Sequence, residues 1–486
     1  MLTPQIIDEL RAAVGDAGLI VDKTQLQTYE CDGLTNFRAI PGAVVLPRTA
    51  DQVAAAVHVC AIHKIPFVAR GAGTGLSGGA LPTPGCVVIG LARMNRVHSI
   101  DFENALITVE PGVTNSQVTD LVRSAGFFYA PDPSSQIVCT IGGNLAENAG
   151  GAHCLKYGFT VTHVLGCELV LPTGELVWLG SSTGVPDTPG YDLTGVFIGS
   201  EGTLGVATKA VLRIVRRPEC VQTLLAAFDS STAAAQTVSD IIAAGMLPSA
   251  MEMMDRTSIF AAEAAVHAGY PDCESLLLVE LDGPIDEVHS QMQRVREVCT
   301  KNAAWEQRLA QSDTERALVW KGRKAAFAAM GRVSPNYIVQ DGVIPRTQLP
   351  RVLDEMARMS AETGLRIANV FHAGDGNLHP MVLYDGSHPG EEERALDLSY
   401  KILQLCVDAG GSITGEHGVG REKQCVMNYM FAEPDLATMH RVRHAFDPHN
   451  LANPEKLFPT PRLCGERSRG NYIPHPIETA GLAEAF

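Results

Sequence analysis

The segment Arg70-Gly-Ala-Gly-Thr-Gly-Leu-Ser-Gly-Gly79 decides how this chain of 486 residues folds. Three of its glycines, Gly73, Gly75 and Gly78, match the G-x-G-x-x-G spacing of dinucleotide-binding Rossmann turns. A Rossmann turn must open a helix, whereas Leu81-Pro-Thr-Pro-Gly85 follows here and blocks one. The pattern therefore predicts a glycine-rich loop whose successive backbone N–H groups wrap an anion such as a diphosphate.

Two more glycine-rich segments lie downstream. Ile141-Gly-Gly-Asn-Leu-Ala-Glu-Asn-Ala-Gly-Gly151 places paired glycines on both sides of a single helical turn. Phe197-Ile-Gly-Ser-Glu-Gly-Thr-Leu-Gly-Val206 adds three glycines where another backbone segment can approach closely. One such loop alone is compatible with a surface loop that binds no ligand, but three in one region indicate a long ligand.

Together the three segments resemble the FAD-binding domain of the vanillyl-alcohol-oxidase flavoprotein superfamily. The resemblance implies that the first loop holds the pyrophosphate of FAD, while the second and third line its isoalloxazine and ribityl parts. The FAD-binding residues it implies are Arg70, Gly71, Gly73, Thr74, Gly75, Ser77, Gly78, Gly142, Gly143, Asn144, Asn148, Gly150, Gly151, Glu201, Gly202 and Gly205.

The same resemblance bears on how FAD is attached. Relatives with a covalent flavin use a histidine in the first loop or a cysteine near the second. No histidine lies between Arg70 and Gly79, and Cys139 and Cys154 beside the second loop are expected to be small buried residues. We therefore expect FAD to be bound without a covalent link.

The remaining pattern predicts an α+β fold, in which a two-part FAD-binding domain of the vanillyl-alcohol-oxidase type precedes an α+β substrate (cap) domain with an antiparallel sheet. Apolar runs between turn residues predict strands at 44–46, 65–69, 86–91, 106–109, 167–171, 176–178, 221–228 and 275–281. The expected division is a helical N-terminal segment (1–40), the FAD-binding domain (41–216), the substrate and metal-binding domain (217–455) and a C-terminal strap (456–486).

Composition excludes several classes of protein. Lys and Arg total 38 against 54 Asp and Glu, and the resulting charge of −16 repels nucleic acids. The uncharged stretch 71–92 is too rich in glycine and proline to span a membrane, and the N-terminus lacks the basic start of a signal peptide. The 12 cysteines include no C-x-x-C pair, so no iron–sulfur site is expected. We expect a cytoplasmic protein without a membrane span of its own.

A second group of residues concerns metal binding. His372 and His379 flank the turn Ala373-Gly-Asp-Gly376, which predicts a hairpin that brings both imidazoles together. Glu416 and His417 lie in a glycine-rich loop further on. Two imidazoles and a carboxylate are typical ligands of a catalytic zinc or manganese ion, although histidines satisfied within their turns would give the same pattern.

The runs 369–380, 411–423 and 446–456 resemble the C-terminal domain of the FAD-linked D-2-hydroxy-acid dehydrogenases, and residues 19–464 as a whole resemble the flavin subunits of bacterial glycolate oxidases. The resemblance implies catalytic and metal-binding roles for five residues. They are His372, His379 and Glu416 as metal ligands, His417 as the base and Arg323 as the carboxylate-binding residue.

The chain departs from relatives that act on larger diacids. Those relatives have a threonine where Phe327 stands, and a lysine that is missing between Val333 and Gln340 here. A second substrate carboxylate thus has no evident partner. The expected reaction is the oxidation of a small 2-hydroxy acid, glycolate to glyoxylate before D-lactate to pyruvate, by hydride transfer to flavin N5.

The resemblance also implies partners that reoxidise the reduced flavin. They are a second subunit similar to an FAD domain and an iron–sulfur subunit that passes electrons to the quinone of the inner membrane. Two alternatives stay open. One is a stand-alone D-lactate or D-2-hydroxyglutarate dehydrogenase. The other is a non-catalytic flavin subunit that only transfers electrons.

Overall fold

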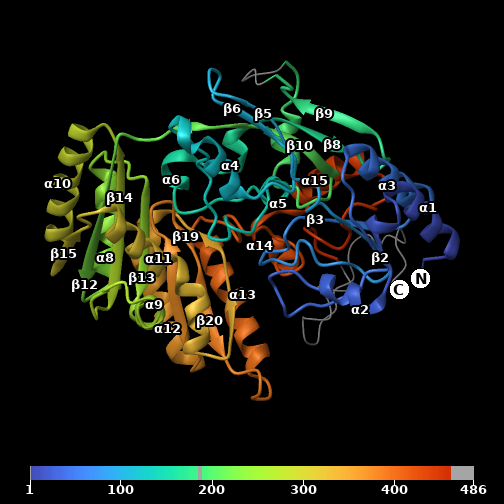
Figure 1. The fold of residues 1–486 in the computed structure, drawn as a ribbon. Coiled ribbons are helices and arrows are strands. Elements are labelled where there is room, and N and C mark those ends of the chain that lie inside the picture. The colour runs from blue at the N-terminus through green and yellow to red at the C-terminus, as the bar shows by residue number, and fades with distance from the viewer. Residues whose placement is uncertain (1, 184–188, 461–486) are drawn as a thin grey trace.

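The computed structural model describes residues 2–183 and 189–460 (Figure 1). Near the N-terminus, one sheet has the strand order β1 (Leu19–Ile20), β2 (Ala43–Val45), β4 (Val87–Gly90) and β3 (Phe67–Arg70). Strands β2 and β3 run parallel to β4, because α3 (Ala50–Ile62) carries the chain across between them. Strand β3 ends at Arg70, and the first glycine-rich loop follows directly.

A second sheet completes the FAD-binding region. Its order is β5 (Val97–Asp101), β6 (Leu106–Val109), β10 (Val206–Arg213), β8 (Val164–Val170) and β9 (Leu176–Gly180), with antiparallel neighbours throughout. The helical turn of the second glycine-rich segment is α5 (Ile141–Glu147), and it packs Ile141 and Leu145 into the core under this sheet. The third segment runs directly into β10, so both segments are fixed by one core.

The second half of the chain builds a larger antiparallel sheet, as the sequence predicts. Its strands in spatial order are β15 (Glu306–Leu309), β12 (Cys220–Phe228), β14 (Ser275–Gly283), β13 (Ala250–Asp255), β18 (Ile367–His372), β19 (Asn377–Leu378) and β17 (Gly342–Val343). Strand β20 (Pro380–Tyr384) pairs with both β18 and β16 (Asn336–Val339). Alternate residues of β12 enter different cores on the two faces of the sheet.

Helices cover both faces of this sheet (Figure 1). One core receives side chains from α8 (Ser231–Ala243), α10 (Ile285–Lys301), α12 (Leu349–Thr363) and α13 (Glu391–Asp408). The other receives α9 (Arg256–Val266) and α11 (Asp313–Ala329). Helix α11 therefore lies on the face opposite α12 and α13.

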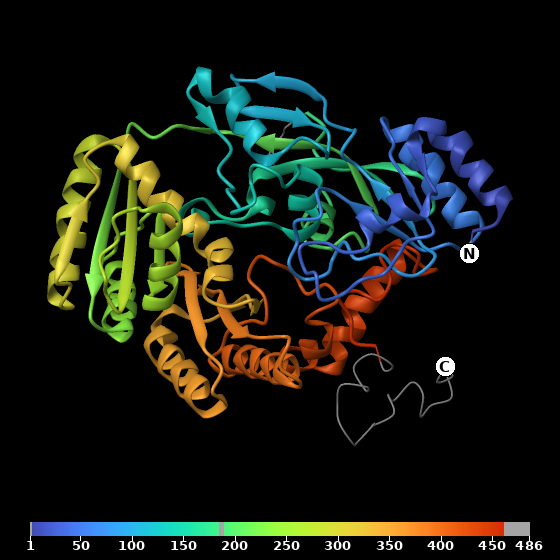
Figure 2. The same ribbon diagram turned by 60° about the horizontal axis from the view of Figure 1, so that its bottom comes forward.

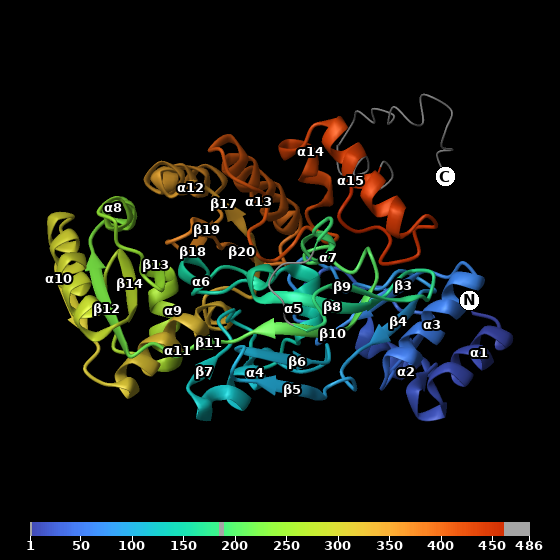
Figure 3. The ribbon, with the colours of Figure 1, turned by 90° about the horizontal axis from the view of Figure 1, so that it is seen from above.

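After α13 the chain returns to the FAD-binding region. Helix α14 (Met427–Met430) lies beside α13, and α15 (Glu433–Phe446) runs from there toward the N-terminal elements (Figures 2 and 3). Leu451 and Ala452 are buried in the core of the first sheet, where Phe67 donates its N–H to the Leu451 carbonyl at 2.9 Å. The C-terminal segment thus joins the two halves of the molecule.

The α+β class, the two-part build of the N-terminal half and the antiparallel second sheet are confirmed. The helical expectation for residues 1–40 holds for α1 (Pro4–Val14) and the short α2 (Lys23–Leu26) but is wrong at β1, which pairs Leu19 with Val45. Two apolar residues are too few to show a strand period in sequence. The predicted domain boundaries remain predictions, and most of the expected strap, 461–486, lies outside the described residues.

The smaller described elements are β7 (Phe127–Phe128), α4 (Asn115–Val122), α6 (Cys154–Tyr157), α7 (Leu193–Phe197) and β11 (Val215–Arg216). Among the helices of residues 2–183 and 189–460, none has the length and apolar character needed to cross a membrane.

Candidate functional site

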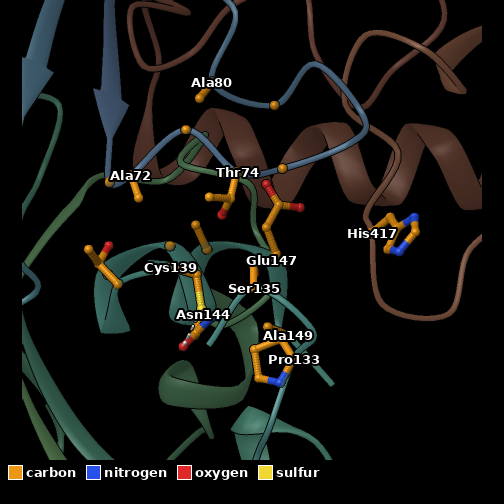
Figure 4. Close-up of a pocket in the computed structure, with 18 of the residues that line it drawn as sticks. Ala72, Thr74, Ala80, Pro133, Ser135, Cys139, Asn144, Glu147, Ala149 and His417 are labelled. Carbon is orange, nitrogen blue, oxygen red and sulfur yellow. Dashed lines mark hydrogen bonds between the residues drawn. The ribbon is translucent and has the colours of Figure 1, made fainter. Parts of the chain in front are cut away.

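A cavity of about 410 Å³ lies where the three glycine-rich loops meet the large sheet (Figure 4). Its wall includes His379, Glu416 and His417 from the second half of the chain. It also includes residues expected to bind FAD, namely Arg70, Gly71, Gly73, Thr74, Gly75, Gly142, Gly143, Asn144, Gly150, Glu201, Gly202 and Gly205. The two groups of residues singled out in the sequence therefore share one cavity.

The lining of the cavity suits a long, mainly flat ligand with a diphosphate. A side chain placed on Gly75 would meet no protein atom within 4 Å, so this part of the first loop is open to a ligand. Thr140 also lines the cavity, and its buried hydroxyl has no hydrogen-bond partner among the described residues. Open backbone and an unused hydroxyl are what a bound FAD would require at these positions.

Four of the expected FAD residues do not line the cavity, namely Ser77, Gly78, Asn148 and Gly151. The Ser77 carbonyl accepts the N–H groups of Arg421 and Glu422 at 2.9 and 3.0 Å. The Asn148 side chain accepts the N–H of Val161 at 2.9 Å. These groups hold the loops in shape, and direct contact with FAD stays a prediction for them.

Cys139 lines the cavity and Cys154 does not. The Cys139 thiol is buried beside Asn144, whose amide donates to it at 3.5 Å (Figure 4). Burial raises the pKa of both thiols above its usual range, which disfavours the thiolate needed for covalent attachment.

Glu201 connects the third glycine-rich segment with the loop that carries Glu416 and His417. Its carboxylate accepts the backbone N–H groups of Val419 and Gly420 at 2.7 and 2.6 Å. Gly420 adopts φ +51°, and a side chain there would lie 2.2 Å from the Ser77 carbonyl oxygen. Only glycine allows this approach, so the first and third flavin loops and the 416–420 loop are fixed to one another.

The predicted hairpin is present. His372 at the end of β18 pairs with Asn377 at the start of β19, and the His372 and His379 rings lie 5.1 Å apart. One carboxylate oxygen of Glu416 lies 3.2 Å from Nε2 of each of these imidazoles and 3.8 Å from Nε2 of His417. We call these four residues the site cluster.

Two buried carboxylates, Glu252 and Asp341, contact residues of the site cluster. Glu252 on β13 lies 2.6 Å from Nδ1 of His372. Asp341 accepts backbone N–H groups of the Glu416 loop, including that of His417 at 2.9 Å, and faces the ammonium of Lys423 at 3.3 Å. Both carboxylates orient residues that face the cavity, a role that outer partners of metal ligands commonly have.

The charges of the site cluster are strongly perturbed. Burial alone would lower the pKa of His372, but attraction to Glu252 and Glu416 holds it well above 6.5. Burial would raise the pKa of Glu416, yet the facing imidazoles of His372 and His379 keep it well below 4.5. Burial lowers the pKa of His417 to about 4, so its imidazole is neutral near pH 7.

The donor atoms of His372, His379 and Glu416 lie within 4.8 Å of one another, close enough for one ion. The mixed nitrogen and oxygen donors suit zinc or manganese. Asp341, His379 and His417 form a second set with the same property. The expected metal ligands are thus together, with an overlapping set beside them.

Arg323 lies deeper than expected. Its guanidinium is 2% exposed, makes an ion pair with Glu252 at 2.5 Å and does not belong to the cavity wall. Its neighbours Lys324 and Phe327 on α11 do line the cavity. A direct contact between Arg323 and a substrate carboxylate therefore stays a prediction.

Three residues at the site, Glu252, Asp341 and Glu147, were not predicted from the sequence. Glu252 sits in the apolar run Ala-Met-Glu-Met-Met of β13, where a lone carboxylate signals a buried partner. Asp341 begins the turn into β17 and leaves no such signal. Glu147 faces the cavity near Thr74 (Figure 4), and burial together with Glu201 raises its pKa well above 4.5.

Comparisons with known proteins place the chain among flavoenzymes. Family models match twice, "FAD binding domain" at residues 41–180 and "FAD linked oxidases, C-terminal domain" at residues 217–457. Glycolate oxidase subunit GlcD of Escherichia coli K12 is 48% identical over 462 residues, which cover 95% of this chain and 92% of GlcD. The Bacillus subtilis GlcD is 37% identical over 459 residues, 94% and 97% of the two chains. The solved structure of p-cresol methylhydroxylase, 20% identical, has the same fold, with a TM-score of 0.79 over 93% of this chain and 96% of that one.

Proposed function

The chain belongs to the FAD-linked oxidases, a family of FAD-dependent oxidoreductases, and on this premise we propose that it oxidises a small 2-hydroxy monocarboxylate. Glycolate, giving glyoxylate, is the first candidate, and D-lactate, giving pyruvate, is the second. The observation that carries the proposal is the single cavity shared by the three glycine-rich loops and the site cluster. A 2-hydroxy acid held there would lie against both groups at once.

In this proposal the glycine-rich loops serve the transfer of the hydride, and the site cluster serves the removal of the proton. The glycine-rich loops would hold FAD, which would supply the acceptor for the α-hydrogen and its electron pair, that is, for a hydride. The hydroxyl proton must leave separately, and His417 is the residue proposed to take it. Its imidazole lines the cavity, and the Asp341 carboxylate fixes its backbone N–H. A neutral imidazole held in this way can act as a general base.

We propose that His372, His379 and Glu416 hold a divalent metal, zinc or manganese. Such an ion, when bound, would lower the pKa of the substrate hydroxyl by Lewis acidity. The role of the chain is to orient its ligands. Glu252 fixes the tautomer and ring direction of His372 through Nδ1, which leaves Nε2 to face Glu416.

Arg323 remains the proposed carboxylate-binding arginine. Because it already pairs with Glu252, it would reach a substrate only by sharing that contact. Phe327 occupies the wall near His379, at 5.7 Å between ring centroids, and presents no polar group to a second acid group. This supports a short monocarboxylate over D-2-hydroxyglutarate.

The proposed electron acceptor is a separate iron–sulfur subunit, together with a second subunit similar to an FAD domain. The name of the relative GlcD makes it a subunit of glycolate oxidase, which supports the proposal of further subunits for this chain. In this proposal, association with the inner membrane would come through such partners. Copurification with a tagged chain, followed by iron analysis, tests it, and full oxygen-linked turnover by the chain alone would contradict it.

The decisive experiment mixes the purified FAD-loaded protein anaerobically with glycolate, D-lactate and D-2-hydroxyglutarate while the flavin absorbance is recorded. We expect glycolate or D-lactate to bleach the flavin fastest. Faster reduction by D-2-hydroxyglutarate would reject the substrate proposal. No bleaching by any of the three would favour a flavin subunit that only transfers electrons.

The same preparation tests the mode of FAD binding. Acid precipitation should leave the yellow colour in the supernatant, because the FAD is proposed to be non-covalent. Colour that pellets with the protein would contradict this, and Cys139→Ala would then identify the attachment site.

A further inference from the structure

We infer that Lys324 is a second residue that binds the carboxylate of the 2-hydroxy acid, beside the proposed Arg323, and that it sets the preference for an anionic substrate. The inference rests on the proposed function and names the cation which that function requires. Lys324 lies on α11, directly after Arg323, and its side chain lines the cavity.

The placement of Lys324 comes from the helical period of α11. Lys324 and Phe327 are three residues apart and so lie on the same face of the helix, with Cβ atoms about 5–6 Å apart. The Phe327 ring contacts His379 edge-on at 5.7 Å. Lys324 is therefore within one helical turn of a residue that contacts the site cluster, and both line the same cavity.

Among the described residues, Lys324 is also the least committed cation of the cavity wall. Its one ion pair is to Asp132 at 3.6 Å, too long for a hydrogen bond. Asp132 is already satisfied by His153, whose Nδ1 lies 3.0 Å away. The three N–H donors of Lys324 are thus available to a ligand.

Two other cations lie near the cavity, Arg323 behind its wall and Arg70 in the first loop. Arg323 makes a buried ion pair with Glu252, and Arg70 of the first loop donates to the Cys31 carbonyl at 2.8 Å. The carboxylates of Glu147, Glu201 and Glu416 line the same cavity. An anionic substrate entering among these acids needs a nearby positive charge, and Lys324 provides it.

The test compares Lys324→Met with Lys324→Arg and with the control Lys321→Met. Lys321 stands three residues earlier on α11, is exposed and does not line the cavity. All variants are purified with FAD, and flavin reduction is followed anaerobically against glycolate and against its neutral analogue glycolamide. Oxalate binding is measured from the perturbation of the flavin spectrum.

We expect Lys324→Met to raise the dissociation constants of glycolate and oxalate about 10- to 100-fold, since a hydrogen bond to a charged group is lost. The discrimination between glycolate and glycolamide should shrink by a similar factor. Lys324→Arg should recover most of the affinity, and Lys321→Met should match the parent. The limiting reduction rate at saturating glycolate should change much less than the affinity.

Unchanged affinity for glycolate and oxalate in Lys324→Met would overturn the inference. A shifted flavin midpoint potential with unchanged oxalate affinity would also overturn it, because the lysine would then act on the flavin. The proposed function fails separately, if no 2-hydroxy acid reduces the flavin of the parent. Oxalate binding still decides the role of Lys324 in that case. If Lys324→Met does not retain FAD, the neutral variant Lys324→Gln is measured in its place: a smaller glycolate-to-glycolamide ratio than in the parent supports the inference, and an unchanged ratio overturns it.

Discussion

The site cluster and a second, partly buried cluster contain the same kinds of groups, imidazoles and carboxylates, in opposite arrangements. The second, which we call the interface cluster, consists of His153, Asp132, Glu280 and Trp320. There each nitrogen of a single imidazole has its own carboxylate, Nδ1 with Asp132 at 3.0 Å and Nε2 with Glu280 at 3.1 Å. In the site cluster, three imidazoles instead converge on one oxygen of Glu416.

The difference teaches how to separate a structural cluster from a functional one. The second oxygen of Glu280 accepts hydrogen bonds from Thr223 and from Trp320, at 2.5 and 2.6 Å, so the interface cluster is satisfied within the protein. In the site cluster, Nδ1 of His379 has no hydrogen bond among the described residues. Side chains that converge on one point can bind an ion or a substrate there. Side chains that pair with one another instead hold two parts of the fold together.

The position of the interface cluster fits this structural role. His153 follows the second glycine-rich segment, Glu280 lies on β14, and Trp320 lies on α11. Beside it, the Tyr157 hydroxyl donates to Asp282 of β14 at 2.8 Å, and Lys156 makes an ion pair with the same carboxylate. These contacts fasten the FAD-binding region to the large sheet.

The sharpest contrast is expected from removing a carboxylate charge in each cluster. Glu416→Gln should lose the proposed metal and slow flavin reduction about 10³-fold or more, because the Lewis-acid stabilisation that such an ion would supply is worth several kcal/mol. Bound FAD should remain. The matched variant Glu280→Gln should keep metal and activity while it loses stability. Metal analysis and stopped-flow flavin reduction on both proteins make the comparison, and equal metal content would show that the clusters do not differ as argued.

The second effect concerns the base. His417→Ala should keep metal and FAD but slow flavin reduction about 10²–10⁴-fold, the usual loss of a general base. His379 alone cannot replace it, since its Nε2 faces Glu416 at 3.2 Å. Flavin reduction at saturating substrate is the measurement. A rate equal to that of the parent would remove His417 from the mechanism.

The third variant, His153→Gln, removes the imidazole of the interface cluster, and its effect on the free energy of unfolding should depend on pH. Burial alone would lower the pKa of His153, but attraction to Asp132 and Glu280 holds it well above 6.5. A raised pKa in the folded state means that the stabilisation is complete below about pH 6.5 and is lost as the pH rises through the folded value. His153→Gln should therefore lower the free energy of unfolding by about 3–5 kcal/mol near pH 6, and by less at higher pH.

Chemical denaturation of the parent and His153→Gln at several pH values measures this difference. The difference should narrow steadily as the pH is raised. A difference that stays constant with pH would mean that His153 contributes by packing and hydrogen bonding alone. Metal content should not change, in contrast to Glu416→Gln.

Local patterns made much of this structure predictable. The turn at Ala373–Gly376 predicted the hairpin of His372 correctly, and the apolar run at 275–281 predicted β14. The partners of these elements could not be read in the same way, because Glu252 lies 120 residues before His372. Their meeting depends on the order of strands in the sheet, which leaves no periodic signal in sequence.

The same limit applies to side-chain direction and to the interface cluster. The resemblance implied a substrate-binding role for Arg323, but packing of α11 turns its guanidinium to Glu252 and leaves Lys324 at the cavity. His153 lies directly before α6, and Glu280 lies 127 residues later on β14. A lone histidine after a glycine-rich segment and a lone glutamate in an apolar strand gave no reason to pair them.

The smallest effect should come from removing one neutral donor of the interface cluster. Trp320→Phe deletes the N–H that donates to Glu280 at 2.6 Å and keeps most of the ring. Glu280 still has His153 and Thr223 as partners, so the loss should be about 1.5–3 kcal/mol, the value of one hydrogen bond to a charged group. Because the charged pair survives, the pH dependence of unfolding should match that of the parent, unlike that of His153→Gln. Denaturation curves at the same pH values test this, and a flattened pH dependence would mean that Trp320 helps to hold the proton on His153.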